Sequence, residues 1–180
     1  MNKIAIAVLL SIFISVNAAA SEGVADQEGT IHAGIKLGPS DVTGNPIGFG
    51  VYGGYTLFGP NTFKNQAFFS KLSMAVEGEY VHLGNASSLG VSYSAATLGA
   101  VAAATYPIND QFSVIVKAGM ASVTSKASGC GLLCNASSTS IGVHTGAAGH
   151  FNITPKIGVR AGYDSYPNHS MLSVGGVFKF

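Results

Sequence analysis

Six charged side chains stand out because each is predicted to face an interior lined mainly by glycine, serine, alanine and threonine. They lie in segments with alternating side-chain character, and strand side chains point to opposite faces in turn. Opposite charges in a narrow interior could plug it, or exchange partners and gate a small pore. The alternative is a static set of ion pairs that neutralise one another where water is scarce. We favour the static set, which consists of Lys36, Glu77, Glu79, Lys117, Arg160 and Asp164.

Three histidines offer a general base for catalysis. His32, His144 and His150 fall on the same predicted interior faces as Glu77 and Glu79. A carboxylate beside an imidazole can orient it for proton transfer. Lone histidines in a sheet are usually structural, so we assign no catalytic residue. We expect no enzymatic activity, no cofactor and no resident metal.

Cys130 and Cys134 lie in residues 124–138, the longest predicted loop. In an exported chain, an oxidising compartment favours a disulfide that closes a small ring at the loop tip. Coordination of a metal by the two thiolates and a histidine is the alternative. No histidine lies close to them in the sequence, so the disulfide is the preferred interpretation.

Composition points to a β-rich protein in apolar surroundings. Of 180 residues only 9% are charged, against roughly 25% in an average soluble protein, while 47% are apolar and 24 are glycine. Beyond the N-terminus no apolar run approaches the roughly 20 residues of a membrane helix. Without residues 1–20, 8 basic and 8 acidic side chains remain, because Lys3 is the one charged residue of that segment. This balance gives no support to a nucleic-acid partner.

Residues 1–20 have the pattern of a secretory signal peptide. Lys3 supplies a basic start, residues 4–16 are apolar, and residues 18–20 are alanines that suit cleavage. An uncleaved anchor is the alternative, but the apolar stretch is too short to span a bilayer comfortably. We expect a flexible lead-in over residues 21–28 and one domain over residues 29–180.

The remaining chain is predicted to form eight strands with apolar and small residues in alternation. Only one segment, 91–106, has an uncertain phase, because Tyr93 is out of step with Leu98 and Tyr106; a bulge would reconcile them. Turn-forming residues separate the strands. An even number of strands places both ends on one side, and the opposite side receives loops 38–46, 84–90, 124–138 and 167–169. The predicted strands are 29–38, 47–57, 71–83, 91–106, 111–123, 139–151, 156–166 and 172–180.

The polar face of these strands decides between a soluble and a membrane barrel. A water-soluble barrel needs many charged residues on its outer surface. Here the polar face is mostly glycine, serine, alanine and threonine, which suits a narrow interior. The other face is apolar, with aromatics near both predicted strand ends, as in interfacial girdles. The fold class is therefore all-β, an eight-stranded antiparallel up-and-down transmembrane β-barrel.

The signal segment, the eight alternating strands and the closing GGVFKF resemble small outer-membrane barrels of the OmpA-like, or opacity-type porin, superfamily. In that superfamily a terminal aromatic preceded by alternating apolar residues resembles the signal read by the outer-membrane assembly machinery. The resemblance implies export through the periplasm to the outer membrane. It also implies contact with outer-membrane lipid and lipopolysaccharide. The matching positions are Leu172, Val174, Gly176, Phe178 and Phe180.

Three functions remain open within that resemblance. The preferred one is a non-enzymatic surface or structural protein whose loops contact a host or envelope protein, although the predicted loops look short for a dedicated adhesin. The second is a narrow channel for small solutes, gated by the interior charges. The third is a lipid-modifying enzyme similar to lipid A deacylases, which use an outward-facing His–Ser pair. Here Gly146 occupies the position two after His144, and His144 is predicted to face inward.

Overall fold

A computed structural model describes residues 28–60, 62, 69–88, 91–129 and 135–180. The predicted signal segment 1–20, most of the lead-in 21–28 and both cysteines lie outside the described residues. Within that described part, no helix has the length and apolar character needed to cross a membrane.

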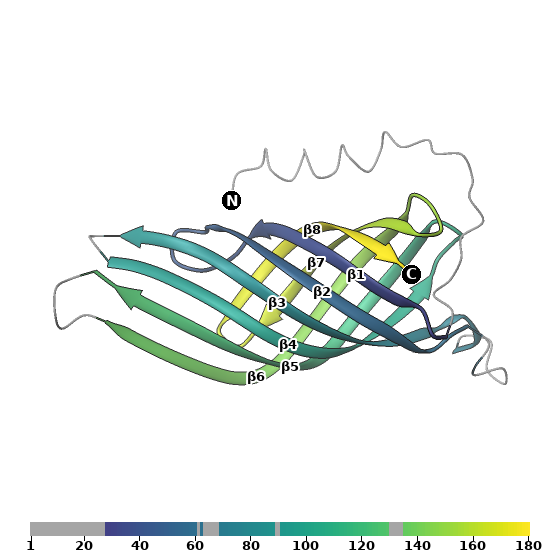
Figure 1. Cartoon of the computed structure of the whole chain (residues 1–180), viewed down its shortest axis with the longest axis horizontal. Coiled ribbons are helices and arrows are strands. Elements are labelled where there is room, and N and C mark those ends of the chain that lie inside the picture. The colour runs from purple at the N-terminus through teal and green to yellow at the C-terminus, as the bar shows by residue number, and fades with distance from the viewer. Residues whose placement is uncertain (1–27, 61, 63–68, 89–90, 130–134) are drawn as a thin grey trace.

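Eight antiparallel strands form a closed barrel in which each strand pairs with the next and β1 pairs with β8 (Figure 1). This confirms the predicted fold class. A short 3₁₀ helix, η1 (Phe69–Lys71), precedes the third strand. The strands are β1 (Ile31–Pro39), β2 (Ile47–Phe58), β3 (Ser73–Ser88), β4 (Val91–Pro107), β5 (Phe112–Ser128), β6 (Ala136–Asn152), β7 (Ile157–Tyr166) and β8 (His169–Lys179).

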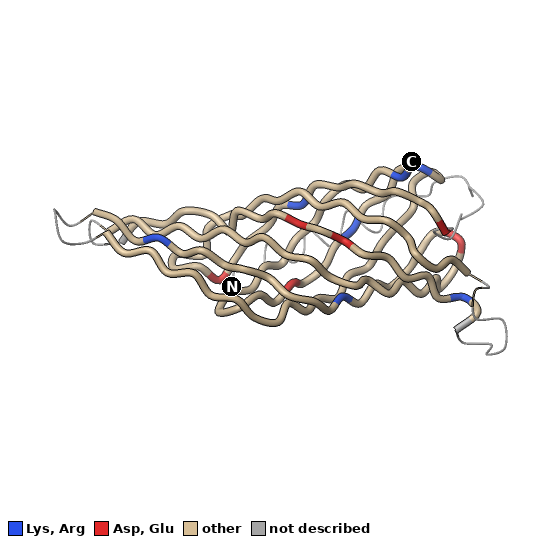
Figure 2. Tube along the Cα trace, turned by 60° about the horizontal axis from the view of Figure 1, so that its bottom comes forward, with Lys and Arg blue, Asp and Glu red and all other residues tan. Residues whose placement is uncertain are grey.

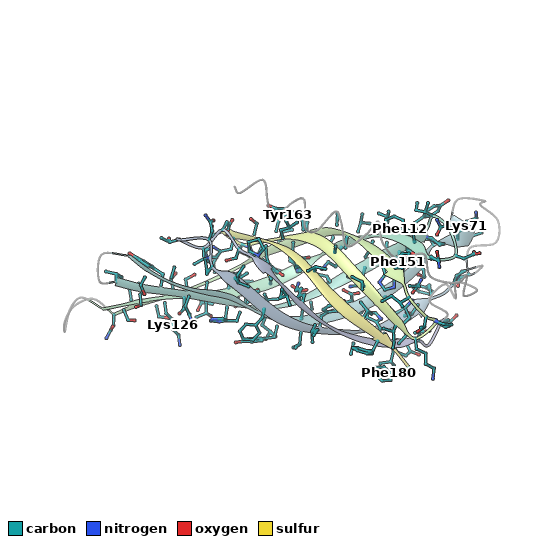
Figure 3. The ribbon with its side chains drawn as sticks, turned by 90° about the horizontal axis from the view of Figure 1, so that it is seen from above. Lys71, Phe112, Lys126, Phe151, Tyr163 and Phe180 are labelled. Carbon is teal, nitrogen blue, oxygen red and sulfur yellow. The ribbon has the colours of Figure 1, made fainter. Side chains whose placement is uncertain are left out.

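Side chains alternate between the inside and the outside of the barrel as the sequence predicts. Along β1 every second residue is buried, and the exposed ones are apolar apart from the final Pro39. Large apolar side chains stay uncovered on other strands too, such as Leu98 and Ile141, at 65% and 70% exposure. At the end where the described chain terminates, Phe112 pairs directly with Phe151, and Phe180 lies at the same end on the other side of the barrel (Figure 3). A continuous apolar belt therefore surrounds the barrel.

The barrel wall is much taller on one side than on the other. β4, β5 and β6 each have 17 residues, about six more than a bilayer crossing needs. Together with β3 they project beyond the short strands β1, β2, β7 and β8 (Figure 1). The four longer strands, β3 to β6, are called the tall wall. The prediction of loops over residues 84–90 and 124–138 was therefore wrong for most of these residues, which form the ends of β3, β5 and β6. Residues of these segments satisfy the hydrogen-bonding groups of their backbone by pairing across the two hairpins, for example Asn85 with Ser94.

The irregularity predicted within residues 91–106 lies on the neighbouring strand instead. β4 pairs with β5 without interruption, from Ser92 to Pro107. The register shift occurs in β3 between His82 and Gly84, opposite β4. Gly84 has a φ of 106°, a left-handed conformation that glycine adopts without strain. A second shift lies between Thr56 and Phe58 of β2.

The inner face of β5 passes through the layers that fill the barrel. From the terminal end upward, Ser113 lines the mouth, Ile115 packs in a small apolar cluster, and Lys117 belongs to a charged layer. Val123 then joins a larger apolar cluster, called the outer apolar cap. The cap consists of Val42, Val81, Leu83, Ala95, Ala121, Val123, Tyr166 and Met171.

Candidate functional site

The six predicted interior charges all face the lumen, and they come from alternate strands. β1 provides Lys36, β3 both glutamates, β5 Lys117, and β7 both Arg160 and Asp164. Figure 2 shows red and blue segments gathered in the middle of the barrel. The structure brings these residues together in two groups, an outer group nearer the cap and an inner group nearer the chain termini.

The outer group links two lysines to two carboxylates. Lys36 Nζ lies 2.8 Å from Glu79 Oε2 and 2.9 Å from Asp164 Oδ2. Lys117 Nζ lies 2.5 Å from Asp164 Oδ1 and 3.7 Å from Glu79 Oε2. All four residues are at least nine-tenths buried. Two positive and two negative charges therefore neutralise one another in a region with little water.

The inner group joins Glu77 to a guanidinium and an imidazole. Arg160 Nη1 donates to both Glu77 carboxylate oxygens, at 2.8 and 3.1 Å. His32 Nε2 lies 3.0 Å from Glu77 Oε1. The guanidinium also stacks over the Tyr52 ring, 4.7 Å from its centroid. Glu77 thus has three hydrogen-bonding contacts, and Arg160 is held against an aromatic face.

His144 and Tyr166 belong to the outer group, and neither was among the six predicted interior charges. Lys36 Nζ donates to the Tyr166 hydroxyl at 2.9 Å. His144 Nε2 lies 3.4 Å from Asp164 Oδ1, and its Nδ1 lies 3.7 Å from Glu79 Oε1. The alternation along β6 already placed His144 inward. Its partners depend on the pairing register, which alternation does not give.

Glu79, His144 and Asp164 have ligand atoms within 4.8 Å of one another, close enough to be tested as a metal site. Both carboxylates already contact the ammonium groups of Lys36 and Lys117. A divalent cation here would meet two positive charges at short range. These residues therefore do not fit a metal ion and are better described as a neutral ion-pair cluster.

Little space remains in the lumen around these groups. Between the two groups, a cavity lined by Tyr52, Lys117, Arg160 and Asp164 holds about 10 Å³, room for one water molecule. A cavity of the same volume lies at the terminal end, beside His150. The outer apolar cap covers the opposite end. Among the described residues, the lumen around the charged groups is therefore filled rather than open.

The remaining two candidate histidines have structural partners. His150 Nε2 lies 2.9 Å from Asn152 Oδ1, which also accepts a hydrogen bond from Lys179 Nζ at 2.9 Å. His32 pairs with Glu77, as described above. The residues of the expected assembly signal lie on β8 and at the chain end, with Leu172, Phe178 and Phe180 exposed on the outside.

Comparison with known proteins gives the family. A model of the outer membrane protein beta-barrel domain matches residues 6–171, most of the chain. The chain belongs to this outer-membrane β-barrel family. The barrel is thus an outer-membrane protein, and its apolar belt faces lipid.

Several solved structures share the fold of this outer-membrane barrel. The attachment invasion locus protein Ail of Yersinia pestis is 20% identical, with a TM-score of 0.59 over 86% of this chain and 100% of that one. The N-terminal β-barrel domain of Pseudomonas aeruginosa OprF has a TM-score of 0.63 at 12% identity, with the same coverage. Neisserial surface protein A has a TM-score of 0.57 at 16% identity, over 84% of this chain and 96% of that one. No curated protein sequence matches the chain. At these identities the similarity concerns the fold alone.

Proposed function

We propose that this barrel is a closed surface protein that does not conduct solutes and presents its tall wall to envelope or host partners. One observation carries the proposal: the interior charges pair with one another beneath an apolar cap. A pore would have to break buried ion pairs, at about 3–5 kcal/mol for each pair that loses one partner. It would also have to displace the apolar cap, most of whose residues carry no charge that a change of pairing could move.

The tall wall favours a partner without strong negative charge. Ail, whose name refers to attachment and invasion, has also been solved in complex with the heparin analogue sucrose octasulfate. That ligand is a polyanion and calls for several cations. In this chain, the described projecting ends of β3 to β6 (residues 84–88, 91–95, 124–128 and 136–140) contain one charged residue, Lys126, among mainly serine, alanine and threonine. Hydroxyl groups on a sheet suit hydrogen bonding to a neutral peptide or saccharide surface.

The lipid and assembly partners follow from the belt and the last strand. Lipopolysaccharide and phospholipid would pack on the apolar belt. The outer-membrane assembly machinery would read the alternating apolar face of β8 that ends at Phe180. Its exposed side, with Phe178 at 48% and Phe180 at 78% exposure, supports that assignment.

Conductance of the full-length protein in planar bilayers tests the closed barrel. We expect no defined openings from the unaltered protein, and none from Glu77→Gln or Arg160→Gln, because the apolar cap remains in both. The matched control is Lys156→Gln, which removes an exposed charge at the β6–β7 turn. Defined openings in the unaltered protein whose size changes in Glu77→Gln or Arg160→Gln, but not in the control, would establish the gated channel instead.

A further inference from the structure

Three side chains from separate parts of the chain meet just outside the apolar cap. Ser125 is on the inner face of β5, two residues beyond the capping Val123. His169 begins β8, and Asp41 lies in the β1–β2 connection. Ser125 Oγ lies 3.4 Å from His169 Nε2. His169 Nδ1 lies 3.4 Å from Asp41 Oδ1. A hydroxyl, an imidazole and a carboxylate thus lie next to one another in that order.

Asp41 is fixed in place by the residue that follows the histidine. The Ser170 backbone N–H donates to Asp41 Oδ1 at 2.8 Å, and the Ser170 hydroxyl donates to Oδ2 at 2.8 Å. The Asp41 backbone N–H also donates to the Ser170 carbonyl at 3.1 Å. These contacts hold the carboxylate against the start of β8 and therefore beside His169.

Ser125 and His169 are positioned by the ladder and by a tight turn. Ser125 is paired with Ala95 on one side and with Ser138 on the other, so its backbone is held within the sheet. Asn168 has a φ of 63°, and this left-handed residue turns the chain into β8 at His169. The hydroxyl is thus presented from a rigid strand, as a nucleophile requires.

This order of groups is the one used for nucleophilic acyl transfer. A carboxylate on Nδ1 keeps the proton on that nitrogen, which leaves the Nε2 lone pair free to take the serine proton. Distances of 3.4 Å are usual for such contacts without substrate, because they shorten when the substrate binds. His144 in the lumen differs, since it has a carboxylate near both ring nitrogens.

We propose that Ser125, His169 and Asp41 form an esterase site on the outer side of the barrel, beyond the closed-lumen function proposed above. The substrate class is a carboxylic ester with a small apolar acyl group. Tyr93 and Ala127, paired with each other in the β4–β5 ladder, lie on the same face of the sheet as Ser125 and provide an apolar wall. The one charge nearby on β5, Lys126, points to the opposite face (Figure 3).

The reaction balances with water as the co-reactant. Ser125 Oγ adds to the carbonyl carbon while its proton moves to His169 Nε2, and the carbonyl electrons form an oxyanion. The oxyanion is assigned to two donors, the Ser138 hydroxyl opposite Ser125 and the second N–H of the Asn168 side-chain amide, whose nitrogen also donates to Ser140 Oγ at 3.3 Å. The ester C–O bond then breaks, and the alcohol leaves with the proton from His169. Water releases the acid from acyl-Ser125 by the same proton transfers.

The test uses full-length protein folded in detergent micelles, a fluorophosphonate probe and p-nitrophenyl butyrate. We expect the probe to lose fluoride and attach to Ser125 Oγ, an adduct that peptide mass mapping locates. Ser125→Ala and His169→Gln should each lower labelling and butyrate hydrolysis at least tenfold. Ser137→Ala, which removes an exposed hydroxyl on the outer face of β6, is the matched control and should change neither.

The Asp41→Asn variant distinguishes a catalytic role of the three residues from a structural one. In the structural role they would only join the β1–β2 connection to the β7–β8 turn. Asparagine keeps an oxygen that accepts from Ser170 but no longer favours the needed histidine tautomer. We expect labelling to fall at least tenfold while the unboiled protein still migrates as a folded barrel, and Asp41→Glu to recover part of the labelling. Absence of an adduct on Ser125, or hydrolysis unchanged in Ser125→Ala, would show that the three residues only hold the β1–β2 connection, β5 and the start of β8 together.

Discussion

Lys36 illustrates what the interior of this barrel demands of a single side chain. Its ammonium group contacts the carboxylates of Glu79 and Asp164 and the hydroxyl of Tyr166, all within 2.9 Å. Each contact replaces a water that the filled lumen does not admit. The cluster is therefore stable only as a complete set, because one missing charge leaves another buried without compensation.

Replacement of Lys36 by methionine should lower the free energy of unfolding by about 3–5 kcal/mol, since two buried carboxylates would then share Lys117. The measurement is urea-induced unfolding of the barrel in lipid vesicles, followed by its migration on gels. Lys156→Met, an exposed lysine at the β6–β7 turn, is the control and should change stability by at most about 0.5 kcal/mol. The double variant Lys36→Met with Glu79→Gln should recover part of the loss. Equal stability of Lys36→Met and the control would contradict a coupled cluster.

At the residue scale, the sequence predicts which side chains face inward but not which ones meet. Alternation with period two places Lys36, Glu77 and Lys117 on the correct face without any knowledge of neighbours. Their partners depend on the stagger between strands that are far apart in the sequence. For the same reason Ser125, His169 and Asp41 gave no signal: they are separated by 44 and 128 positions and come together through barrel closure.

At the element scale, the pairing of β1 with β8 closes the barrel, and glycine allows these two strands to approach closely. A Cβ atom at Gly175 would collide with the backbone carbonyl of Ile35, whereas a Cβ atom at Gly176 would meet nothing within 4 Å. The eight strands and the inner and outer faces were predictable from alternation. The lengths of β3 to β6 were not, because serine- and alanine-rich segments pair as readily across a long hairpin as they form loops.

Gly175→Ala should impair closure of the barrel, while Gly176→Ala, its neighbour on the lipid-facing side, should not. The added methyl of Gly175→Ala must push β1 and β8 apart, because the colliding atom is backbone and cannot rotate away. The fraction of protein that migrates differently boiled and unboiled after refolding into vesicles measures closure. We expect a marked drop for Gly175→Ala only. Similar yields for both variants would mean that the pairing of β1 with β8 relaxes without cost.

At the scale of the whole molecule, the short and tall walls divide the barrel into two parts with different tasks. The short strands β1, β2, β7 and β8, together with the lipid-facing half of the tall wall, enclose the charged layer and the apolar cap. The projecting ends of β3 to β6 lie beyond both (Figure 1). Their hydroxyl-rich surface lies beyond the lumen, which agrees with the contact with partners proposed above.

Removal of these projecting ends should therefore leave the barrel folded but abolish its contact with partners. A shortened protein would join Gly84 to Ala95 and Thr124 to Thr139 through Asn-Gly turns, because each pair lies directly opposite in its hairpin. We expect unchanged heat-modifiable migration and loss of adherence to host-cell monolayers by bacteria that display the protein. Full adherence of the shortened protein would place the contact elsewhere, whereas failure to fold would show that the projecting sheet is needed for assembly.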